Sequence, residues 1–121
     1  MKELPKSTKV VVIGGGVAGT SCAYHLAKFG WKDVILLERD QLTSGTTWHA
    51  AGLLGQLGAS STITKIRKYS LDLYKELENT TGLSTGMKQN GAITVASTKE
   101  RMQELLRQAT VSYTHLTLPT I

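Results

Sequence analysis

The sequence is poor in cysteine and has no long apolar run, and both absences restrict what the protein can be. One cysteine, Cys22, among 121 residues excludes an internal disulfide and suits a reducing compartment. No stretch of 18 consecutive apolar residues occurs, so the sequence predicts no membrane span. The nine residues before the first apolar run are too short for a signal or transit peptide, unless a longer natural N-terminus precedes them.

Charge of one sign is not concentrated anywhere in the chain. Fourteen Lys and Arg residues against nine Asp and Glu residues give a net charge of +5, without a run of five like charges. Scattered charges of this kind are typical of a solvated surface rather than of a nucleic-acid interface. We therefore expect neither nucleic acid nor a membrane among the partners.

Glycine, in contrast, is abundant, and one glycine-rich stretch organises the chain. The β-branched run Val10–Ile13 stops at Gly14-Gly15-Gly16-Val17-Ala18-Gly19, and a helical pattern follows to about Phe29. A second apolar run, Val34–Leu37, ends at Glu38. Strand, glycine turn, helix, strand and acidic residue form the dinucleotide-binding βαβ pattern, which predicts an α/β, Rossmann-like fold. A glycine-rich turn in an ordinary α/β domain is the alternative.

Each residue type in this pattern has a mechanical role. Gly14 allows a tight turn out of the strand, Gly16 allows the backbone to approach a pyrophosphate, and Gly19 allows the helix to pack closely on the strand. The helix N-terminus near Val17 offers unpaired N–H groups to the phosphates. Glu38 can accept hydrogen bonds from both ribose hydroxyls and would repel a 2′-phosphate, which disfavours NADP.

Three further elements are expected beyond this unit. Apolar periodicity predicts a long helix over 63–79, capped by Ser61 or Thr62, and an amphipathic helix over 99–108. Residues 87–89 and 92–96, joined by Asn90-Gly91, predict a hairpin with a type I′ turn. Such a hairpin would begin a second, β-containing layer on the substrate side. One βαβ unit lacks the other parallel strands that would cover it, so we expect the chain to be part of a longer protein.

Two details of the first helix are also predicted. Ala18, Cys22, Leu26 and Phe29 recur at helical spacing and should face the sheet, and Gly30 suits the helix end. His25 has no Cys, Asp or Glu partner pattern around it and reads as a surface or packing residue rather than a metal ligand. We expect no metal site.

The stretch 39–53 is small, polar and punctuated by glycine, with one Trp-His pair. Taken alone it is a loop with a possible helix start at Ser44 or Thr46. Its backbone N–H groups and hydroxyls could hold a second phosphate or the edge of a flavin. A plain surface loop is the alternative, although its place directly after Glu38 puts it near any bound cofactor.

The last eleven residues, 111–121, break the pattern of the chain. Thr and Leu alternate, charge is absent, and Pro119 ends the run. A strand is one interpretation. The string Val-Ser-Tyr-Thr-His-Leu-Thr-Leu-Pro-Thr also resembles the translation of a transposon-end adapter used to prepare sequencing libraries. On that hypothesis the natural frame ends at about Thr110, and Tyr113 and His115 have no function.

The stretch Leu42-Thr-Ser-Gly-Thr-Thr-Trp-His-Ala-Ala-Gly-Leu53 resembles the sarcosine and dimethylglycine dehydrogenase family, within the larger group of D-amino-acid-oxidase-like flavoproteins. Leu-Leu-Glu-Arg at 36–39, Thr-Gly-Leu at 81–83 and Gln-Asn-Gly at 89–91 also fit. The resemblance covers about residues 9–109. The glycine fingerprint is generic, whereas the block around Trp48-His49 is much more specific.

The resemblance implies that the cofactor is FAD and that His49 bonds covalently to the flavin 8α-methyl group. A histidine that only hydrogen-bonds the flavin is the alternative. Pattern and resemblance together give these candidate cofactor-binding residues: Gly14, Gly16, Val17, Ala18, Gly19, Glu38, Arg39, Gly45, Thr46, Thr47, Trp48, His49, Ala50, Ala51, Gly52 and Leu53.

The resemblance also implies a reaction, the oxidative demethylation of sarcosine or dimethylglycine. Its electron acceptor would be an electron-transfer flavoprotein or oxygen. It implies the mitochondrial matrix in a eukaryote or the cytoplasm in a bacterium, and a possible tetrahydrofolate-binding part further downstream. The substrate-binding and catalytic residues would also lie downstream, so we expect this chain alone to be inactive.

Three other readings stay open. One is a deaminating amino-acid oxidase with loosely bound FAD. Another is a non-enzymatic regulatory subunit of the same fold, although the resemblance implies that such relatives lack the Trp-His pair. The last is an NAD-binding domain, which would not need the loop from Gly45 to Leu53.

Overall fold

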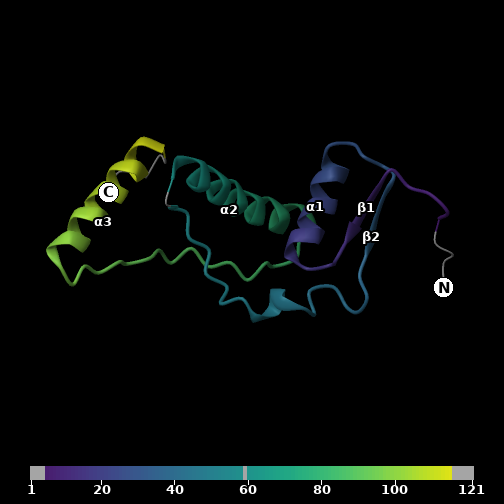
Figure 1. Cartoon of the computed structure of the whole chain (residues 1–121), viewed down its shortest axis with the longest axis horizontal. Coiled ribbons are helices and arrows are strands. Elements are labelled where there is room, and N and C mark those ends of the chain that lie inside the picture. Colours follow the sequence, from purple (N-terminus) through teal and green to yellow (C-terminus); the bar gives the residue numbers. More distant parts are fainter. Residues whose placement is uncertain (1–4, 59, 116–121) are drawn as a thin grey trace. The chain divides into compact units, whose positions relative to one another are not determined.

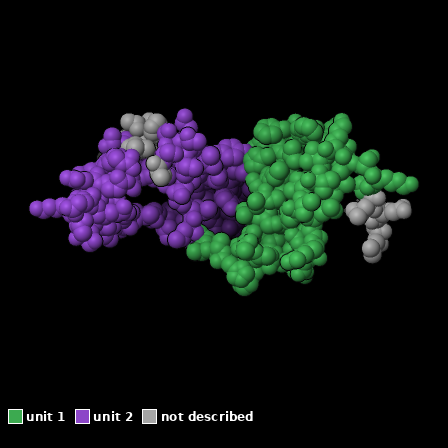
Figure 2. All heavy atoms as spheres, in the orientation of Figure 1, with its two compact units in different colours: residues 1–52 green, residues 53–121 purple. Residues whose placement is uncertain are grey.

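The computed structural model describes residues 5–58 and 60–115. Along the chain it contains β1 (Val10–Ile13), α1 (Val17–Lys28), β2 (Val34–Leu37), the short 3-10 turn η1 (Thr46–His49), α2 (Ser61–Thr81) and α3 (Lys99–His115), as Figure 1 shows. The chain divides into two compact units, Met1–Gly52 and Leu53–Ile121, which are coloured separately in Figure 2.

The first unit is the predicted βαβ unit. β1 and β2 are parallel, with Val10 opposite Val34 and Ile13 opposite Leu37, and α1 connects them and packs against both strands. At the start of the sheet, the Thr8 hydroxyl donates to the Asp33 carboxylate at 2.8 Å. The α/β fold class is therefore confirmed. The two apolar runs are rich in β-branched residues, which favour strands, and the helix between them is long enough to make the crossover that parallel pairing requires.

The ends of α1 follow the sequence, but its buried face does not. Phe29 ends the helix and Gly30 adopts φ +87°, as predicted for a residue at the helix end. The predicted stripe is wrong, since Ala18, Cys22 and Phe29 are exposed. Gly19 faces β1 instead: a Cβ there would lie 3.5 Å from the Val12 side chain. The helix is thus turned so that its smallest residue meets the strand.

The second unit begins with a loop that leads into α2. The cap is Ser60, whose hydroxyl accepts from the Ile63 N–H at 3.3 Å, so the predicted caps Ser61 and Thr62 were one or two residues late. Thr64 is fully buried, and its hydroxyl accepts from the Gly58 N–H at 3.0 Å. α2 ends where Gly82 takes φ +68°. The predicted helix 63–79 is confirmed and extends two residues further at each end.

The predicted hairpin over 87–96 is wrong. No residue from 82 to 96 is in a strand. Gly91 has φ +76°, but Asn90 does not have a positive φ, and a type I′ turn requires both. An isolated two-stranded hairpin is barely stable in water, and this one has no third strand within the described residues. The second β-containing layer is therefore not formed in the part of the chain that the structure describes.

α3 starts at the predicted residue but continues beyond Gln108 to His115. The first five residues of the stretch 111–121 are thus helical rather than a strand, and residues 116–121 lie outside the described residues. α3 packs against α2 within the second unit. Within residues 5–58 and 60–115, no helix combines the length and apolarity that a bilayer crossing requires.

Candidate dinucleotide-binding turn

The glycine turn between β1 and α1 is closed by a backbone hydrogen bond. The Gly14 N–H donates to the Leu37 carbonyl at 2.8 Å, which joins the turn to the end of β2. Gly14 has φ +102°, a conformation that favours glycine. A Cβ on Gly19 would overlap the Gly14 carbonyl oxygen, so the helix can approach the turn only because Gly19 has no side chain. Both predicted roles fit this geometry.

The N-terminus of α1 offers several backbone donors. Gly16 is the residue before the first helical turn and has no side chain to cap it, and no acidic residue lies in that turn. Among the described residues, the N–H groups of Gly16, Ala18 and Gly19 have no hydrogen-bond partner. Such donors, together with the positive end of the helix dipole, favour an anion.

Glu38 lies against this turn. Its Oε2 accepts from the Gly15 N–H at 2.6 Å, and its Oε1 accepts from the Asp40 N–H at 3.1 Å. These two hydrogen bonds, with that from Gly15 the stronger, hold the pKa of the Glu38 carboxyl below its ordinary value, and the Arg39 charge contributes in the same direction. The carboxylate is therefore ionised at neutral pH beside the glycine turn, where a ribose would be held.

Three residues at the turn were not among the candidates. Gly15 is buried and donates to Glu38, and a Cβ on it would press against the Leu42 side chain. Thr43 donates from its N–H to the Gly15 carbonyl at 3.0 Å and has φ +67°. Gly15 could have been found from the sequence, since it is a third glycine inside the fingerprint. Leu42 and Thr43 begin the stretch that carries the family resemblance, but no sequence signal indicates that they contact the glycine turn.

The turn η1 reaches the N-terminus of α1 through one threonine. The hydroxyl of Thr47 accepts from the Val17 N–H, the first of α1, at 2.9 Å. The adjacent rings of Trp48 and His49 have their centroids 3.8 Å apart and are tilted by 31°. The Trp48 indole N–H donates to the Ser44 carbonyl at 3.0 Å. The loop that the sequence singled out thus lies beside the glycine turn.

The remaining candidate residues are less closely connected. Arg39, Gly45, Thr46 and residues 50–52 are exposed. Leu53 is 89% exposed and is the first residue of the second unit. The structure therefore brings together the candidates from 14 to 19 with Glu38 and with residues 47–49.

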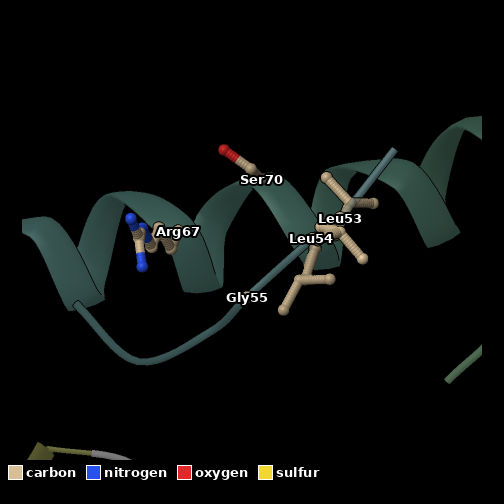
Figure 3. Close-up of a pocket in the computed structure, with 6 residues that line it drawn as sticks. Leu53, Leu54, Gly55, Arg67 and Ser70 are labelled. Carbon is tan, nitrogen blue, oxygen red and sulfur yellow. The ribbon is translucent and has the colours of Figure 1, made fainter. Parts of the chain in front are cut away.

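The second unit has a pocket of its own. It has a volume of about 390 Å³ and is lined by Leu53, Leu54, Gly55, Arg67, Ser70 and Leu71. Figure 3 shows Leu53, Leu54 and Gly55 on the segment that runs beside α2, which contributes Arg67 and Ser70. The Arg67 guanidinium donates to the Leu57 carbonyl, so its charge is directed at the chain itself. No group of three or more His, Cys, Asp or Glu residues that could hold a metal occurs in the described part of the chain.

The first unit fits a dinucleotide. Donors at a helix N-terminus suit a pyrophosphate, an ionised carboxylate at the end of the second strand suits a ribose, and the glycines leave the space that side chains would fill. NAD and FAD share these features. The turn with Trp48 and His49 is an addition that the bare dinucleotide pattern does not contain.

Comparison with known proteins supports the same assignment. The model of the DAO family of FAD-dependent oxidoreductases matches residues 9–118. The chain is 48% identical to human mitochondrial sarcosine dehydrogenase over 107 residues, which are 88% of this chain and 12% of that protein. It is 47% identical to rat mitochondrial dimethylglycine dehydrogenase over 115 residues, 95% of this chain and 13% of that protein.

The chain is also similar to a regulatory subunit and to an oxidase. The mouse mitochondrial pyruvate dehydrogenase phosphatase regulatory subunit is 45% identical over 104 residues, 86% of this chain and 12% of that protein. The crystal structure of glycine oxidase from Geobacillus kaustophilus superposes with a TM-score of 0.68 at 30% identity, covering 93% of this chain and 32% of that one. The chain thus spans about an eighth of the length of the curated relatives that it matches.

Proposed function

Because the chain belongs to the DAO family of FAD-dependent oxidoreductases, we propose that it is the FAD-binding part of an enzyme that oxidatively demethylates sarcosine or dimethylglycine. One observation carries the proposal: the turn Thr46–His49, with its Trp-His pair, is bonded to the first N–H of the helix that follows the glycine turn. The similarity to the two N-methylglycine dehydrogenases supports the choice of substrate.

Different candidate residues would hold different parts of FAD. The N–H groups at the start of α1 would bind the pyrophosphate, and the Glu38 carboxylate, kept ionised by its two N–H donors, would bind the ribose. Arg39 would lie on the adenosine side, and residues 45–53 would wrap the rest of the cofactor. When bound, FAD supplies the two-electron acceptor for oxidation of an amine C–H bond.

His49 would hold the flavin covalently at its 8α-methyl group. A neutral imidazole is a nucleophile near pH 7. The His49 ring lies against the Trp48 ring, with 3.8 Å between centroids and a tilt of 31°, and this contact would favour one orientation of the imidazole. A histidine held this way suits attachment better than a freely rotating one.

The surrounding biochemistry belongs to the parent protein. We propose an electron-transfer flavoprotein or oxygen as the electron acceptor, and tetrahydrofolate as a possible ligand of a further part of the parent. The mitochondrial matrix is the expected location in a eukaryote and the cytoplasm in a bacterium. The substrate-binding residues would lie in the rest of the parent protein. Residues 111–121 would be derived from a sequencing adapter. Resequencing the gene across codon 110 tests the origin of these residues.

The test begins with a longer gene that contains residues 1–110. The protein is expressed and precipitated with acid, and flavin fluorescence is measured in the pellet and in the supernatant. The purified protein is then given sarcosine or dimethylglycine with an artificial electron acceptor, and formaldehyde is measured. Flavin in the pellet together with formaldehyde release is the expected result. Absence of flavin from both fractions would refute the proposal.

A second candidate is an amino-acid oxidase with non-covalent FAD, which the superposition on glycine oxidase favours. It predicts that all flavin appears in the supernatant and that sarcosine yields methylamine and glyoxylate, without formaldehyde. A non-enzymatic regulatory protein, suggested by the similarity to the phosphatase regulatory subunit, predicts none of these products.

A further inference from the structure

Within the described residues, the loop that carries Trp48 and His49 is bonded to the glycine turn and α1 by the Thr43 N–H, which donates to the Gly15 carbonyl, and, in the turn Thr46–His49 itself, by Thr47. Among the described residues from 44 to 52, the other hydrogen bonds are local, such as those from the Trp48 indole to the Ser44 carbonyl and from the Ala50 N–H to the Thr47 carbonyl. The exception is the Thr47 hydroxyl, which accepts from the Val17 N–H at 2.9 Å. Thr47 is also half-buried, whereas the residues on either side of it from 44 to 52 are exposed.

Gly16 makes room for this contact. A Cβ on Gly16 would lie 3.0 Å from the Thr47 hydroxyl oxygen, closer than side chains normally approach. As the residue before α1, Gly16 also has no side chain of its own to accept from the first N–H groups. In most helices the residue directly before the first turn is a Ser, Thr, Asp or Asn, whose side chain accepts from an N–H of that turn. In α1 the acceptor is instead the hydroxyl of Thr47, which lies 30 residues after Val17 in the sequence.

We propose that Thr47 is a positioning residue: its hydroxyl caps α1 from a distance and so fixes the turn Thr46–His49 against the cofactor-binding helix. Trp48 and His49 follow Thr47 directly, and their rings are stacked, so an anchor at Thr47 restricts both. The consequence for flavin attachment at His49 rests on the proposed function. The anchoring itself does not, because it is a property of the polypeptide.

The first experiment uses the cofactor-free 121-residue chain. Amide hydrogen exchange is measured for Val17 and for residues 44–50 in the wild type, in Thr47→Val, which keeps the shape but removes the acceptor, and in Thr47→Ser, which keeps the acceptor. Thr94→Val is the matched control, because Thr94 is exposed in the segment between α2 and α3. Loss of one hydrogen bond should accelerate exchange at Val17 roughly two- to tenfold in Thr47→Val alone.

The second experiment uses the longer parent protein and separates positioning from cofactor binding. We expect Thr47→Val to lower the fraction of the bound flavin that stays in the acid pellet, and this fraction is normalised to the total flavin that each variant binds. Thr47→Ser should restore the wild-type fraction. If Thr47→Val only destabilised the fold, the total amount of bound flavin would fall, but the covalently attached fraction of the flavin still bound would equal that of the wild type.

The outcomes separate the two proposals. Unchanged exchange at Val17 in Thr47→Val, or equal acceleration in Thr47→Ser, would overturn the anchoring role. If Thr47→Val loses its helical circular dichroism altogether, Thr47→Ser decides the matter, since it must then keep Val17 protected. A parent protein without flavin would refute the proposed function, and the exchange result would still decide the role of Thr47.

Discussion

At the scale of single residues, the candidate site depends on where hydrogen-bond acceptors meet the backbone of the glycine turn. Glu38 accepts from Gly15 and Asp40, and Thr47 accepts from Val17. Glu38 directly follows β2, and Thr47 lies in the loop after it. The backbone N–H groups of Gly15 and Val17 therefore hold the segment that follows β2 against the glycine turn.

Glu38 gives this arrangement a pH dependence. Its pKa is lowered in the folded chain, first by the Gly15 N–H and then by the Asp40 N–H. A lowered carboxyl pKa contributes stability that is present above the ordinary carboxyl pKa and is lost as the pH falls through the folded value. We predict that urea denaturation of the wild type shows this acid-side loss and that Glu38→Gln removes that component. Parallel acid profiles for the two proteins would contradict the prediction.

At the scale of elements, the close contact of α1 with the turn depends on Gly19. A Cβ there would overlap the Gly14 carbonyl oxygen, which is backbone and cannot move without opening the turn. We predict that Gly19→Ala lowers the free energy of unfolding by roughly 2 kcal/mol or more, as overpacking does. The measurement is thermal unfolding followed by circular dichroism.

Gly55→Ala is the matched control for Gly19→Ala. A Cβ on Gly55 would meet only the Arg67 side chain at 3.9 Å, an ordinary contact. This variant should unfold within about 0.5 kcal/mol of the wild type, since surface substitutions away from special features have small effects. Equal stability of Gly19→Ala and Gly55→Ala would show that the turn tolerates a side chain.

α3 offers a separate test of its own side-chain contacts. Glu104 accepts from the Arg107 guanidinium at 2.7 and 2.8 Å and from the Gln108 amide at 2.8 Å. These hydrogen bonds, with that from Arg107 the largest, lower the pKa of Glu104 to about 2. A carboxyl NMR titration should place its midpoint near that value, and Arg107→Met should raise it. A wild-type midpoint close to 4 would exclude the fork-like pairing.

The elements that were predictable from sequence are those whose signals are local. The β-branched runs predicted β1 and β2, the glycine turn and Gly30 bounded α1, and apolar periodicity predicted α2, each within a few residues. The hairpin at 87–96 failed because a strand needs a partner that sequence alone does not supply. The contact between Thr47 and Val17 was not predictable either, because it joins residues 30 apart through a loop without periodicity.

At the scale of the whole chain, the most prominent feature is exposed apolar surface. Ile13, Leu53, Ile93 and Val95 are each more than 80% exposed. Isoleucine, leucine and valine side chains are among those most often buried in folded proteins. These side chains are therefore open to solvent in both units of the chain.

This surface predicts the behaviour of the isolated chain. We expect the 121-residue chain to bind a hydrophobic dye such as anilinonaphthalene sulfonate, and a longer parent protein to bind far less of it per molecule. Ile93→Asp should reduce dye binding by the isolated chain without a change in its circular dichroism. Equal dye fluorescence from the chain and the parent would contradict this interpretation of the exposed residues.

The most direct test of the central proposal, that FAD is held at the glycine turn and attached at His49, is a peptide mass measurement. Trypsin cleaves after Arg39 and Lys65, so residues 40–65 form one peptide that contains His49 and no other histidine. In a digest of the purified parent protein, this peptide should carry the added mass of FAD, and the addition should be absent from His49→Ala. An unmodified 40–65 peptide, or flavin found on a different peptide, would contradict the account.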